Sequence, residues 1–324
     1  MKNLVCVGAC YLDTILDVPY YPGEDSKLRA TNLQVRRGGN CPNTLEVLQQ
    51  LLREDGPGHG HGHHHEVRPY LISCLPSADA PATTTILDSF GPGSLVDFSR
   101  CIFRADHRDP ASSYIIRSEA TGSRTLVNYN DLPEMTIDEF IDVANEVGDN
   151  SWFHFEGRIP ETTLQCIRYL RESFPNTRVS VEVEKPGRGG LEDLAAEADV
   201  VFYSRSWAES KRYQSAEQCL RVQSGVARKA FLLLCTWGSD GASCLSVPSE
   251  KAVSCPATLA EQTISVVDTV GAGDTFIAGI LFALLCHQED WDTERKVQFA
   301  VQLATCKVQQ DGFDGVGAEV LKRF

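Results

Sequence analysis

The chain has 324 residues, 42% of them hydrophobic, and a formal net charge of −14. This size and composition are sufficient to bury a large core, and the acidic balance argues against nucleic acids and anionic membranes as partners, because both attract excess Lys and Arg. Twelve cysteines lie mostly in apolar segments without a Cys-x-x-Cys pair, which predicts reduced thiols and a cytoplasmic protein.

The first predicted element is a strand over residues 4–10, whose continuous apolar run is typical of the centre of a sheet covered on both faces. We interpret this run as a strand and not as a cleavable signal, since it is short and is followed at once by Tyr-Leu-Asp. Asp13 comes just after it. Ligands of open α/β sheets bind beyond the carboxyl ends of strands, so Asp13 is placed to accept hydrogen bonds from one; a turn or helix cap is the alternative.

Two glycines and two asparagines precede the first predicted helix. Residues 28–35 predict a strand outside the main sheet, and Arg-Arg-Gly-Gly-Asn-Cys-Pro-Asn follows at residues 36–43, before leucines at helical spacing. Glycines allow a ligand to approach closely, and asparagine side chains both donate and accept, which suits a polyol. An ordinary helix N-terminus is the alternative.

A Gly- and His-rich stretch covers residues 55–66. Its five histidines suit a metal, but we interpret the stretch as a surface insertion before the next predicted strand, residues 69–75. A helix is predicted over residues 83–90.

Residues 112–116 and 124–129 predict two strands joined by the turn Ala-Thr-Gly-Ser. Together with the segment before the first helix they predict a small β-sheet, formed from about residues 12–37 and 108–130. Such a sheet would be a lid that excludes water from a ligand site.

Further apolar strands with polar exits are predicted at residues 152–155, 179–186, 200–205 and 231–235, and a second glycine turn, residues 238–241, follows the last one. Strands that alternate with helical stretches predict a doubly wound, largely parallel sheet with helices on both faces. We expect one α/β domain over residues 1–324, with the small β lid attached.

The most informative stretch runs from residue 264 to residue 286. A β-branched segment, residues 264–267, predicts a strand, which turns on Gly271 and Gly273 into an apolar run that predicts a buried helix. The first amides of a helix lack partners and its dipole is positive there, so this turn predicts an anion site suited to phosphate.

Asp274 adds a carboxylate to the mouth of the same turn. An acid beside an anion site would be repelled by the anion unless it acts on a third group, such as a hydroxyl that loses its proton as it attacks phosphorus. That layout indicates a kinase. A turn with Asp274 as a simple helix cap is the alternative.

The string Asp-Thr-Val-Gly-Ala-Gly-Asp-Thr-Phe, residues 268–276, resembles the C-terminal signature of the ribokinase/PfkB family of carbohydrate kinases at nine consecutive positions. The resemblance implies that Asp274 is the catalytic base and that the amides of Gly271, Ala272 and Gly273 form the anion hole. It implies sugar contacts from Asp13, Gly39, Asn40, Asn43 and Asp274. It implies ATP contacts from Gly238, Ser239, Asp240, Gly241, Gly271 and Gly273. Arg124 begins the second strand of the predicted lid, where its guanidinium could bridge sugar and ATP phosphates; a solvent-facing strand arginine is the alternative.

The same resemblance implies Mg²⁺ as a cofactor and allows a monovalent cation such as K⁺ near Asp268. Many members carry Asn-x-x-Glu to organise Mg²⁺, whereas this chain has Ser-Arg-Ser-Trp at residues 204–207. The sequence therefore leaves the protein contacts of the metal open.

Within the family, Phe-Glu-Gly-Arg (155–158), Ser-Val-Glu-Val-Glu-Lys-Pro (180–186) and Gly-Phe-Asp-Gly (312–315) resemble the ketohexokinase subgroup. This implies ATP-dependent phosphorylation of a ketohexose, such as D-fructose to fructose 1-phosphate, by a homodimer that pairs through the lid. Ribose, another ketose or a sugar acid is the alternative substrate, and a catalytically idle sugar-binding regulatory protein is the alternative function.

Overall fold

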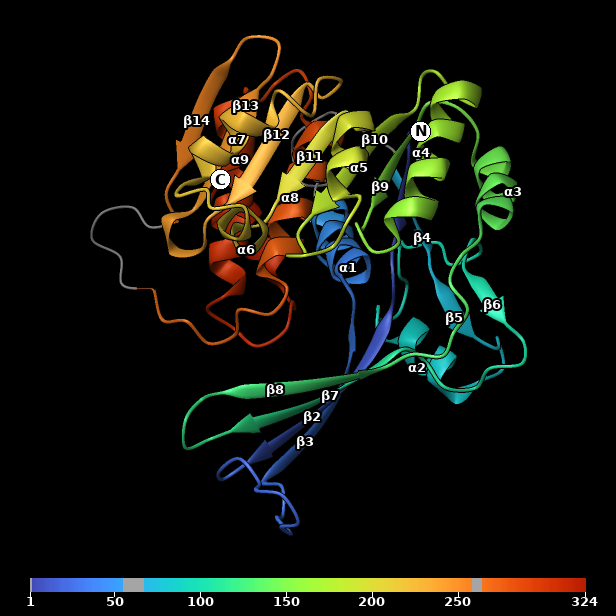
Figure 1. Cartoon of the computed structure of the whole chain (residues 1–324), viewed down its shortest axis with the longest axis vertical. Helices are drawn as coiled ribbons and strands as arrows, with labels where there is room; N and C mark the ends of the chain where they lie inside the picture. The colour runs from blue at the N-terminus through green and yellow to red at the C-terminus, as the bar shows by residue number, and fades with distance from the viewer. Residues whose placement is uncertain (1, 55–66, 258–263) are drawn as a thin grey trace.

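The computed structural model describes residues 2–54, 67–257 and 264–324, so the His-rich stretch at residues 55–66 lies outside the described part of the chain. Its centre is a sheet of eight strands in the order β14-β13-β12-β11-β10-β9-β1-β4 (Figure 1). The six strands from β12 to β4 are parallel, and β13 and β14 complete one edge in antiparallel pairing. The strands are β1 (Lys2–Val7), β4 (Val67–Ile72), β9 (Ser151–Phe155), β10 (Arg178–Val183), β11 (Val200–Tyr203), β12 (Leu232–Thr236), β13 (Ala242–Ser246) and β14 (Lys251–Cys255).

Helices cover both faces of this sheet, which confirms the doubly wound architecture predicted from the sequence. Alternate residues of a strand enter different cores: Leu4 and Cys6 of β1 pack on one side, whereas Val5 and Val7 pack on the other. One core is formed with α1 (Asn40–Glu54), α8 (Ala272–Cys286), α9 (Thr293–Lys307) and α10 (Val316–Leu321). The other is formed with α3 (Ile137–Val147), α4 (Pro160–Ser173), α5 (Leu191–Glu197), α6 (Arg205–Ser210) and α7 (Ala216–Gln223).

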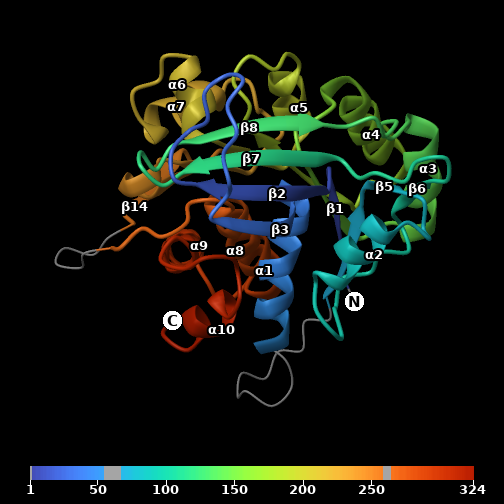
Figure 2. The ribbon, with the colours of Figure 1, turned by 90° about the horizontal axis from the view of Figure 1, so that it is seen from below.

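A second sheet of four strands, in the order β3-β2-β7-β8, extends below the main sheet in Figure 1 and is seen from below in Figure 2. Its strands are β2 (Tyr11–Val18), β3 (Asn32–Gly38), β7 (Ser112–Ser118) and β8 (Arg124–Tyr129). This is the small sheet that the sequence predicts, but β3 begins four residues later than the predicted strand. The reason is pairing with β2, which begins with Asn32 opposite Asp17 and runs to Gly38 opposite Tyr11, so the strand both starts and ends later than predicted.

A third, two-stranded sheet pairs β5 (Cys74–Pro76) with β6 (Ile102–Arg104), and α2 (Pro81–Asp88) lies between them in sequence. α2 is the helix predicted over residues 83–90. All twelve cysteines are free thiols, and Cys74 is the one that is not fully buried. Within the described ranges, none of the helices combines the length and the apolar character that crossing a membrane would require.

The predicted strand at residues 264–267 is wrong. The described segment from residue 264 to residue 269 has no regular secondary structure, and the side chains of Val266 and Val267 are 61% and 59% exposed. The edge of the sheet is already occupied by β14. The amide N–H groups of Val267 and Asp268 instead donate to the carbonyl of Val308, at the end of α9 (2.8 and 3.2 Å).

Candidate active site

The sequence predicts an anion site at the glycine turn before α8, and the structure shows this turn at the start of the helix. Gly271 caps the helix at φ 77°, and a Cβ there would lie 2.3 Å from the Phe313 ring, so only glycine fits. The amide of Ala272 donates to the carbonyl of Thr269 (3.3 Å), whereas helix geometry leaves the amides of Gly273 and Asp274 without intrahelical acceptors. Gly273 is exposed and has no neighbouring atom where a side chain would project, so open space adjoins these donors.

Two cavities meet at this turn. One, of about 560 Å³, lies between the carboxyl ends of the parallel strands and the second sheet; about half of its lining surface is polar, and we call it the polar cleft. The other, of about 600 Å³, has mainly apolar walls. They share Thr236, Thr269, Gly273 and Phe276. The N-terminus of α8 is therefore placed to contact ligands of two different kinds at once.

The polar cleft collects most of the predicted sugar and phosphate residues from segments that are distant in sequence. Its walls include Asp13, Gly39, Asn40, Asn43, Arg124, Gly271, Gly273 and Asp274. Gly39 has φ 108°, and a Cβ there would lie 2.1 Å from the carbonyl oxygen of Ala9, so the close approach of the link between β1 and β2 to the start of α1 requires glycine.

Asp274 is nearly buried, at 9% exposure, in the first turn of α8. Its Oδ2 accepts a hydrogen bond from Asn43 Nδ2 at 2.8 Å. Burial raises the pKa of the Asp274 carboxyl well above its ordinary value, and the negative charge of Glu182 adds to the effect, while the Asn43 hydrogen bond opposes it. A carboxylate with a raised pKa is a stronger base than an ordinary aspartate, which suits the acceptance of a proton from a hydroxyl.

Arg37 fixes the orientation of Asn43. Its Nη1 donates to Asn43 Oδ1 at 3.1 Å, so the amide nitrogen of Asn43 faces Asp274. Arg37 is itself buried, pairs with Glu46 and lies 4.4 Å from the centre of the Phe90 ring. The sequence places Arg37 in the motif but gives no indication of this role.

Asp13 lies on the second sheet, opposite Arg36 of β3 and Ser113 of β7. Burial raises the pKa of its carboxyl, and a hydrogen bond from Ser113 opposes the shift. Arg124 also lies on this sheet and lines the polar cleft, as Gly271 does, whereas the predicted ATP residues Gly238, Ser239, Gly241 and Gly273 line the apolar cavity.

Two acids with raised pKa values were not predicted as site residues: Glu182, which lines the polar cleft, and Glu156, which lines a neighbouring small pocket. Glu156 accepts from the amide of Ala9 at 2.9 Å, and burial raises its pKa to about 7. Burial likewise raises the pKa of Glu182 to about 8, and the charge of Glu184 contributes. Glu182 belongs to the motif at residues 180–186, but the sequence signals no role for it beyond a charged residue in the middle of an apolar strand.

The apolar cavity receives Gly238, Ser239 and Gly241 from the turn after β12, and Ala272 from the glycine turn before α8. Among the described residues that line it, Asp240 is not included. Its apolar wall comes largely from α9 and its surroundings, with Ala242, Ala257, Ile264, Val266, Val301, Ala304 and Val308. A flat, largely apolar ring with a polar tail directed to Gly273 would fit this shape.

The residues at 204–207 do not form a metal site. Ser204 caps α6 by accepting from the amide of Trp207 (3.1 Å) and donates to the carbonyl of Glu184 (2.7 Å), while Trp207 is buried. Mg²⁺ prefers oxygen ligands such as carboxylates. Glu184 offers a carboxylate in the polar cleft, which the N-terminus of α8 also lines.

Asp268 already has a cation beside it. Lys307 is fully buried, and its ammonium donates to Asp268 Oδ2 at 2.7 Å and to the Asp268 carbonyl at 3.1 Å. Hydrogen bonds from Lys307 and from the amide of Val270 lower the pKa of the Asp268 carboxyl, against the effect of its burial. The ammonium thus neutralises a carboxylate three residues before the anion site.

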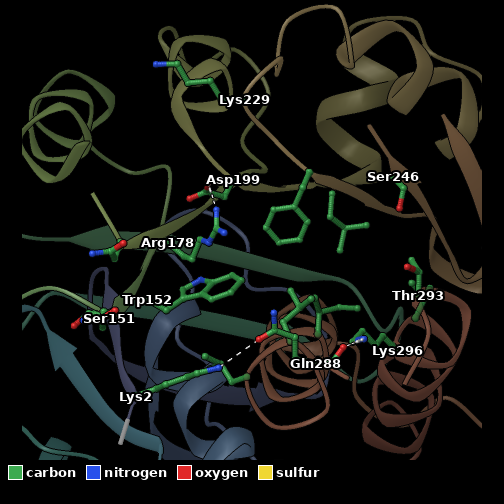
Figure 3. Close-up of a pocket in the computed structure, with 18 residues that line it drawn as sticks. Lys2, Ser151, Trp152, Arg178, Asp199, Lys229, Ser246, Gln288, Thr293 and Lys296 are labelled. Atoms are coloured by element: carbon green, nitrogen blue, oxygen red, sulfur yellow. Dashed lines mark hydrogen bonds and ion pairs between the residues drawn. The ribbon is translucent and has the colours of Figure 1, made fainter. Parts of the chain in front are cut away.

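A third cavity, of about 690 Å³, is larger than either but lies at the amino ends of the parallel strands (Figure 3). Lys2, Ser151 and Arg178, at the starts of β1, β9 and β10, line it, and Arg178 is paired with Asp199. Ligands of open α/β sheets bind at the opposite edge, so we do not assign this cavity to the reaction.

Comparisons with known proteins agree with this geometry. Residues 1–316 match the model of the pfkB family of carbohydrate kinases. Ketohexokinase from Mus musculus is 30% identical over 333 residues, which cover 97% of this chain and 99% of that protein. A fructokinase from Rhizobium leguminosarum bv. trifolii is 33% identical over 111 residues, covering 34% of this chain and 32% of that protein.

Solved structures show the same fold at lower identity. Ribokinase from Giardia lamblia aligns with a TM-score of 0.78 at 15% identity over 100% of this chain and 99% of that one. Arabidopsis thaliana ribokinase, complexed with ribose and ATP, aligns with a TM-score of 0.74 at 20% identity over 99% of this chain and 98% of that one. The chain therefore belongs to the pfkB family of carbohydrate kinases, phosphotransferases with an alcohol acceptor, and has their ribokinase-like fold.

Proposed function

We propose that the protein transfers the γ-phosphoryl group of ATP to a hydroxyl of a ketohexose, with D-fructose as substrate and fructose 1-phosphate as product. The likeness to mouse ketohexokinase along almost the whole chain supports this choice of sugar. The observation that carries the chemistry is the position of Asp274, a basic carboxylate at the point where a polar and an apolar cavity meet.

In the proposed reaction the sugar occupies the polar cleft, held by Asp13, Gly39 and Asn40. Asp274 takes the proton of the reacting sugar hydroxyl. At the same time the hydroxyl oxygen bonds to the γ-phosphorus, and the bond from that phosphorus to the β–γ bridging oxygen breaks. Asn43 has its oxygen occupied by Arg37 and one amide hydrogen by Asp274, so its main task is to orient the base.

ATP would occupy the apolar cavity, with the adenine against α9 and the phosphates along the turn at residues 238–241 toward Gly273. The free amides of the α8 N-terminus stabilise charge on the transferring phosphoryl group, and Arg124 reaches it from the lid. Mg²⁺, when bound with ATP, neutralises charge on the β- and γ-phosphates, and Glu184 would hold its waters.

We further propose that Lys307 supplies the positive charge for which a monovalent cation near Asp268 was a possibility. A buried ammonium with two oxygen contacts meets the electrostatic need of the carboxylate. Turnover would then not depend on K⁺.

The chain would act as a single kinase domain over residues 1–324, with the second sheet as its lid. The register of the four strands places Val35, Thr14, Tyr114 and Val127 side by side in one row, on the face of the sheet opposite Asp13. Val35, Tyr114 and Val127 are 50%, 52% and 64% exposed. A row of exposed apolar side chains on a thin sheet favours a second copy of the chain as its cover, so we propose a homodimer through the lid.

Twelve free cysteines also favour a reducing compartment, and we propose the cytosol. The test of the whole proposal is an assay of ADP release with ketoses, aldoses and sugar acids, followed by NMR identification of the phosphorylated carbon. We expect D-fructose to give the highest kcat/KM and a 1-phosphate. Faster turnover of ribose or a sugar acid would replace the substrate, and sugar binding without ADP release by any of them would indicate a regulatory protein.

A further inference from the structure

A chain of buried polar side chains leads from the main sheet to Asn40 in the sugar cleft. Trp152 Nε1 donates to Ser180 Oγ (2.8 Å), Ser180 Oγ lies 2.9 Å from His154 Nδ1, and His154 Nε2 lies 3.2 Å from Glu182 Oε1. Glu182 Oε2 then accepts from Asn40 Nδ2 at 2.7 Å. His154 and Ser180 are fully buried and Glu182 is 2% exposed, so these groups have no water to replace a lost partner.

The donors and acceptors of this chain run in one direction. Burial lowers the pKa of His154 to about 3, so its ring is neutral and only one of its nitrogens carries a hydrogen. The indole of Trp152 can only donate, which leaves the Ser180 hydroxyl to donate to His154 Nδ1, and therefore His154 Nε2 donates to Glu182.

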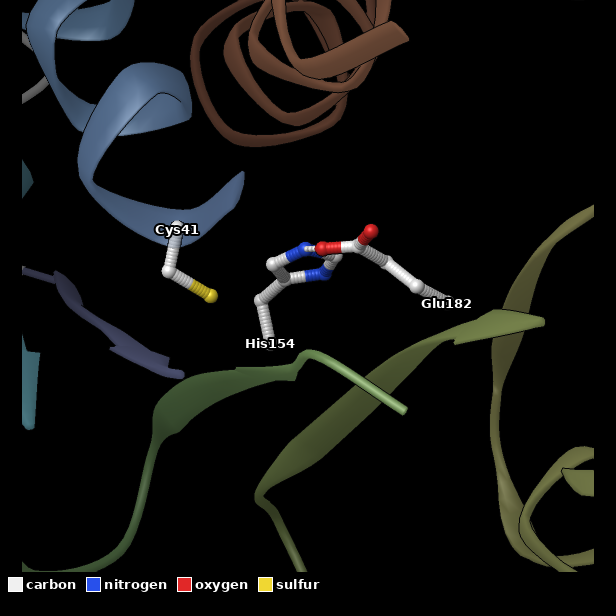
Figure 4. Close-up of side chains that lie close together, drawn as sticks. All are labelled: Cys41, His154 and Glu182. Atoms are coloured by element: carbon white, nitrogen blue, oxygen red, sulfur yellow. Dashed lines mark hydrogen bonds and ion pairs between the residues drawn. The ribbon is translucent and has the colours of Figure 1, made fainter. Parts of the chain in front are cut away.

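Glu182 therefore meets two donors, one on each carboxylate oxygen. Figure 4 shows His154 on β9 and Glu182 on β10 pointing toward each other, with Cys41 of α1 directed at the ring. The atoms with which Cys41, His154 and Glu182 could bind a metal lie within 4.8 Å of one another. The His–Glu pair is already hydrogen-bonded, so we interpret the group as part of the polar chain and not as a metal site.

We propose that Glu182 is a positioning residue that holds Asn40 with its carbonyl oxygen toward the sugar, so that Asn40 recognises a hydroxyl as a donor. The reverse orientation of the Asn40 amide would place its oxygen against the carboxylate of Glu182. The chain through His154 and Ser180 keeps Glu182 in place, and the ring of Phe202, edge-on to His154 at 5.7 Å, restricts the imidazole.

The orientation of Asn40 depends on the ionised form of Glu182, whose pKa burial raises to about 8. Because His154 Nε2 carries its hydrogen, Glu182 Oε1 can only accept, so a proton on Glu182 would lie on Oε2 and face Asn40. Asn40 would then turn its carbonyl oxygen toward Glu182, as it would toward the amide in Glu182→Gln, and the KM comparison below is therefore made at pH 8.5. The amide of Asn43 is held the other way round: its oxygen accepts from Arg37, so its nitrogen faces the cleft and Asp274.

The test is a pair of double-mutant cycles on the sugar KM. It depends on the proposed function only for the choice of sugar, and it uses whichever sugar wild type phosphorylates with the highest kcat/KM. Glu182→Gln lets the Asn40 amide rotate, so we expect the sugar KM to rise about tenfold while the KM for ATP changes less than twofold. In an Asn40→Ala background the same change should alter the sugar KM less than twofold, since the group it orients is gone.

Asn43→Ala provides the matched control, because Asn43 lies in the same cleft but has no hydrogen bond to Glu182. There Glu182→Gln should still raise the sugar KM about tenfold. An equal rise in all three backgrounds, or none in wild type, would overturn the proposal. Should Glu182→Gln fail to fold, Glu182→Asp keeps the charge but shortens its reach, and an unchanged sugar KM in that variant would contradict the proposed positioning.

A crystal structure of Glu182→Gln without sugar gives a readout independent of the substrate. We expect Asn40 to rotate away from the orientation held in wild type. An Asn40 side chain that stays in place would refute the inference even if the kinase acts on an unexpected sugar, whereas failure of every sugar in the ADP assay would refute only the proposed function.

Discussion

Replacement of Asp274 by Asn removes the proposed base while retaining its shape. The new side chain can still accept from Asn43 Nδ2, so the helix and cleft should be preserved. Three other described acids line the cleft. Glu182 has both carboxylate oxygens engaged, Asp13 lies on the second sheet, and Glu184 is the acid we assign to the waters of Mg²⁺, so we expect none of them to take over the proton.

General base catalysis contributes about 10²–10⁴-fold, and the absence of a substitute among these acids favours the upper part of that range. We therefore expect kcat to fall by about 10³–10⁴-fold, which corresponds to about 4–5 kcal/mol of lost transition-state stabilisation. The KM values for sugar and ATP should change little, because the base acts in the transition state.

The same variant should unfold at a higher temperature than wild type at pH 8. The pKa of Asp274 is raised in the fold, so the native state is penalised when the carboxyl ionises above its unfolded pKa, and Asn removes that penalty. The gain should disappear as the pH falls to about 4 and below, where the carboxyl becomes protonated in the unfolded state as well as in the native state.

The assay is steady-state ADP release, with thermal melts at both pH values as a check on folding. A variant that is folded and retains kcat within tenfold of wild type would refute the assignment of Asp274 as the base. A variant that loses turnover together with sugar and ATP binding would point to a structural role.

Three further predictions follow from other parts of the molecule. Val127→Asp on the outer face of the lid should convert a dimer to a monomer in light scattering. Val222→Asp replaces a valine on α7 that is also more than half exposed and should leave the protein dimeric; a dimer in both variants would refute the lid interface. Exchange of K⁺ for Na⁺ should change kcat less than twofold in wild type, while Lys307→Met should create a dependence on K⁺; a wild-type enzyme that requires K⁺ would refute the role of Lys307. The unfolding temperature should fall by about 5 °C from pH 6 to pH 8.5. The pKa values of Glu156 and Glu182 rise from 4.5 to about 7 and about 8 on folding, and the stability that such groups contribute is lost as the pH rises toward the folded value. A flat profile that Glu182→Gln does not alter would contradict this.

Local patterns in the sequence were sufficient to predict most of the architecture. The glycine turn followed by an apolar run predicted α8, and the two β-rich segments around residues 112–129 predicted half of the lid. The family resemblance brought Asn43 and Asp274 to one site although they are 231 residues apart, and the structure joins them by a hydrogen bond.

The features that the sequence missed depend on tertiary contacts. The segment at residues 264–267 has the composition of a strand, but its amides bond to the end of α9 because β14 already occupies the sheet edge. Glu182 and Lys307 look like exceptions in apolar segments until their partners, Asn40 and Asp268, are seen beside them. No local pattern encodes such pairings, since the two members lie far apart in the chain.

The most direct test of the central claim is a crystal structure with the preferred sugar and a non-hydrolysable ATP analogue. The account predicts the reacting hydroxyl within about 3 Å of the Asp274 carboxylate and the γ-phosphate against the amides of the α8 N-terminus. A sugar whose hydroxyls all lie beyond hydrogen-bonding reach of Asp274, or an analogue bound away from Gly273, would contradict it.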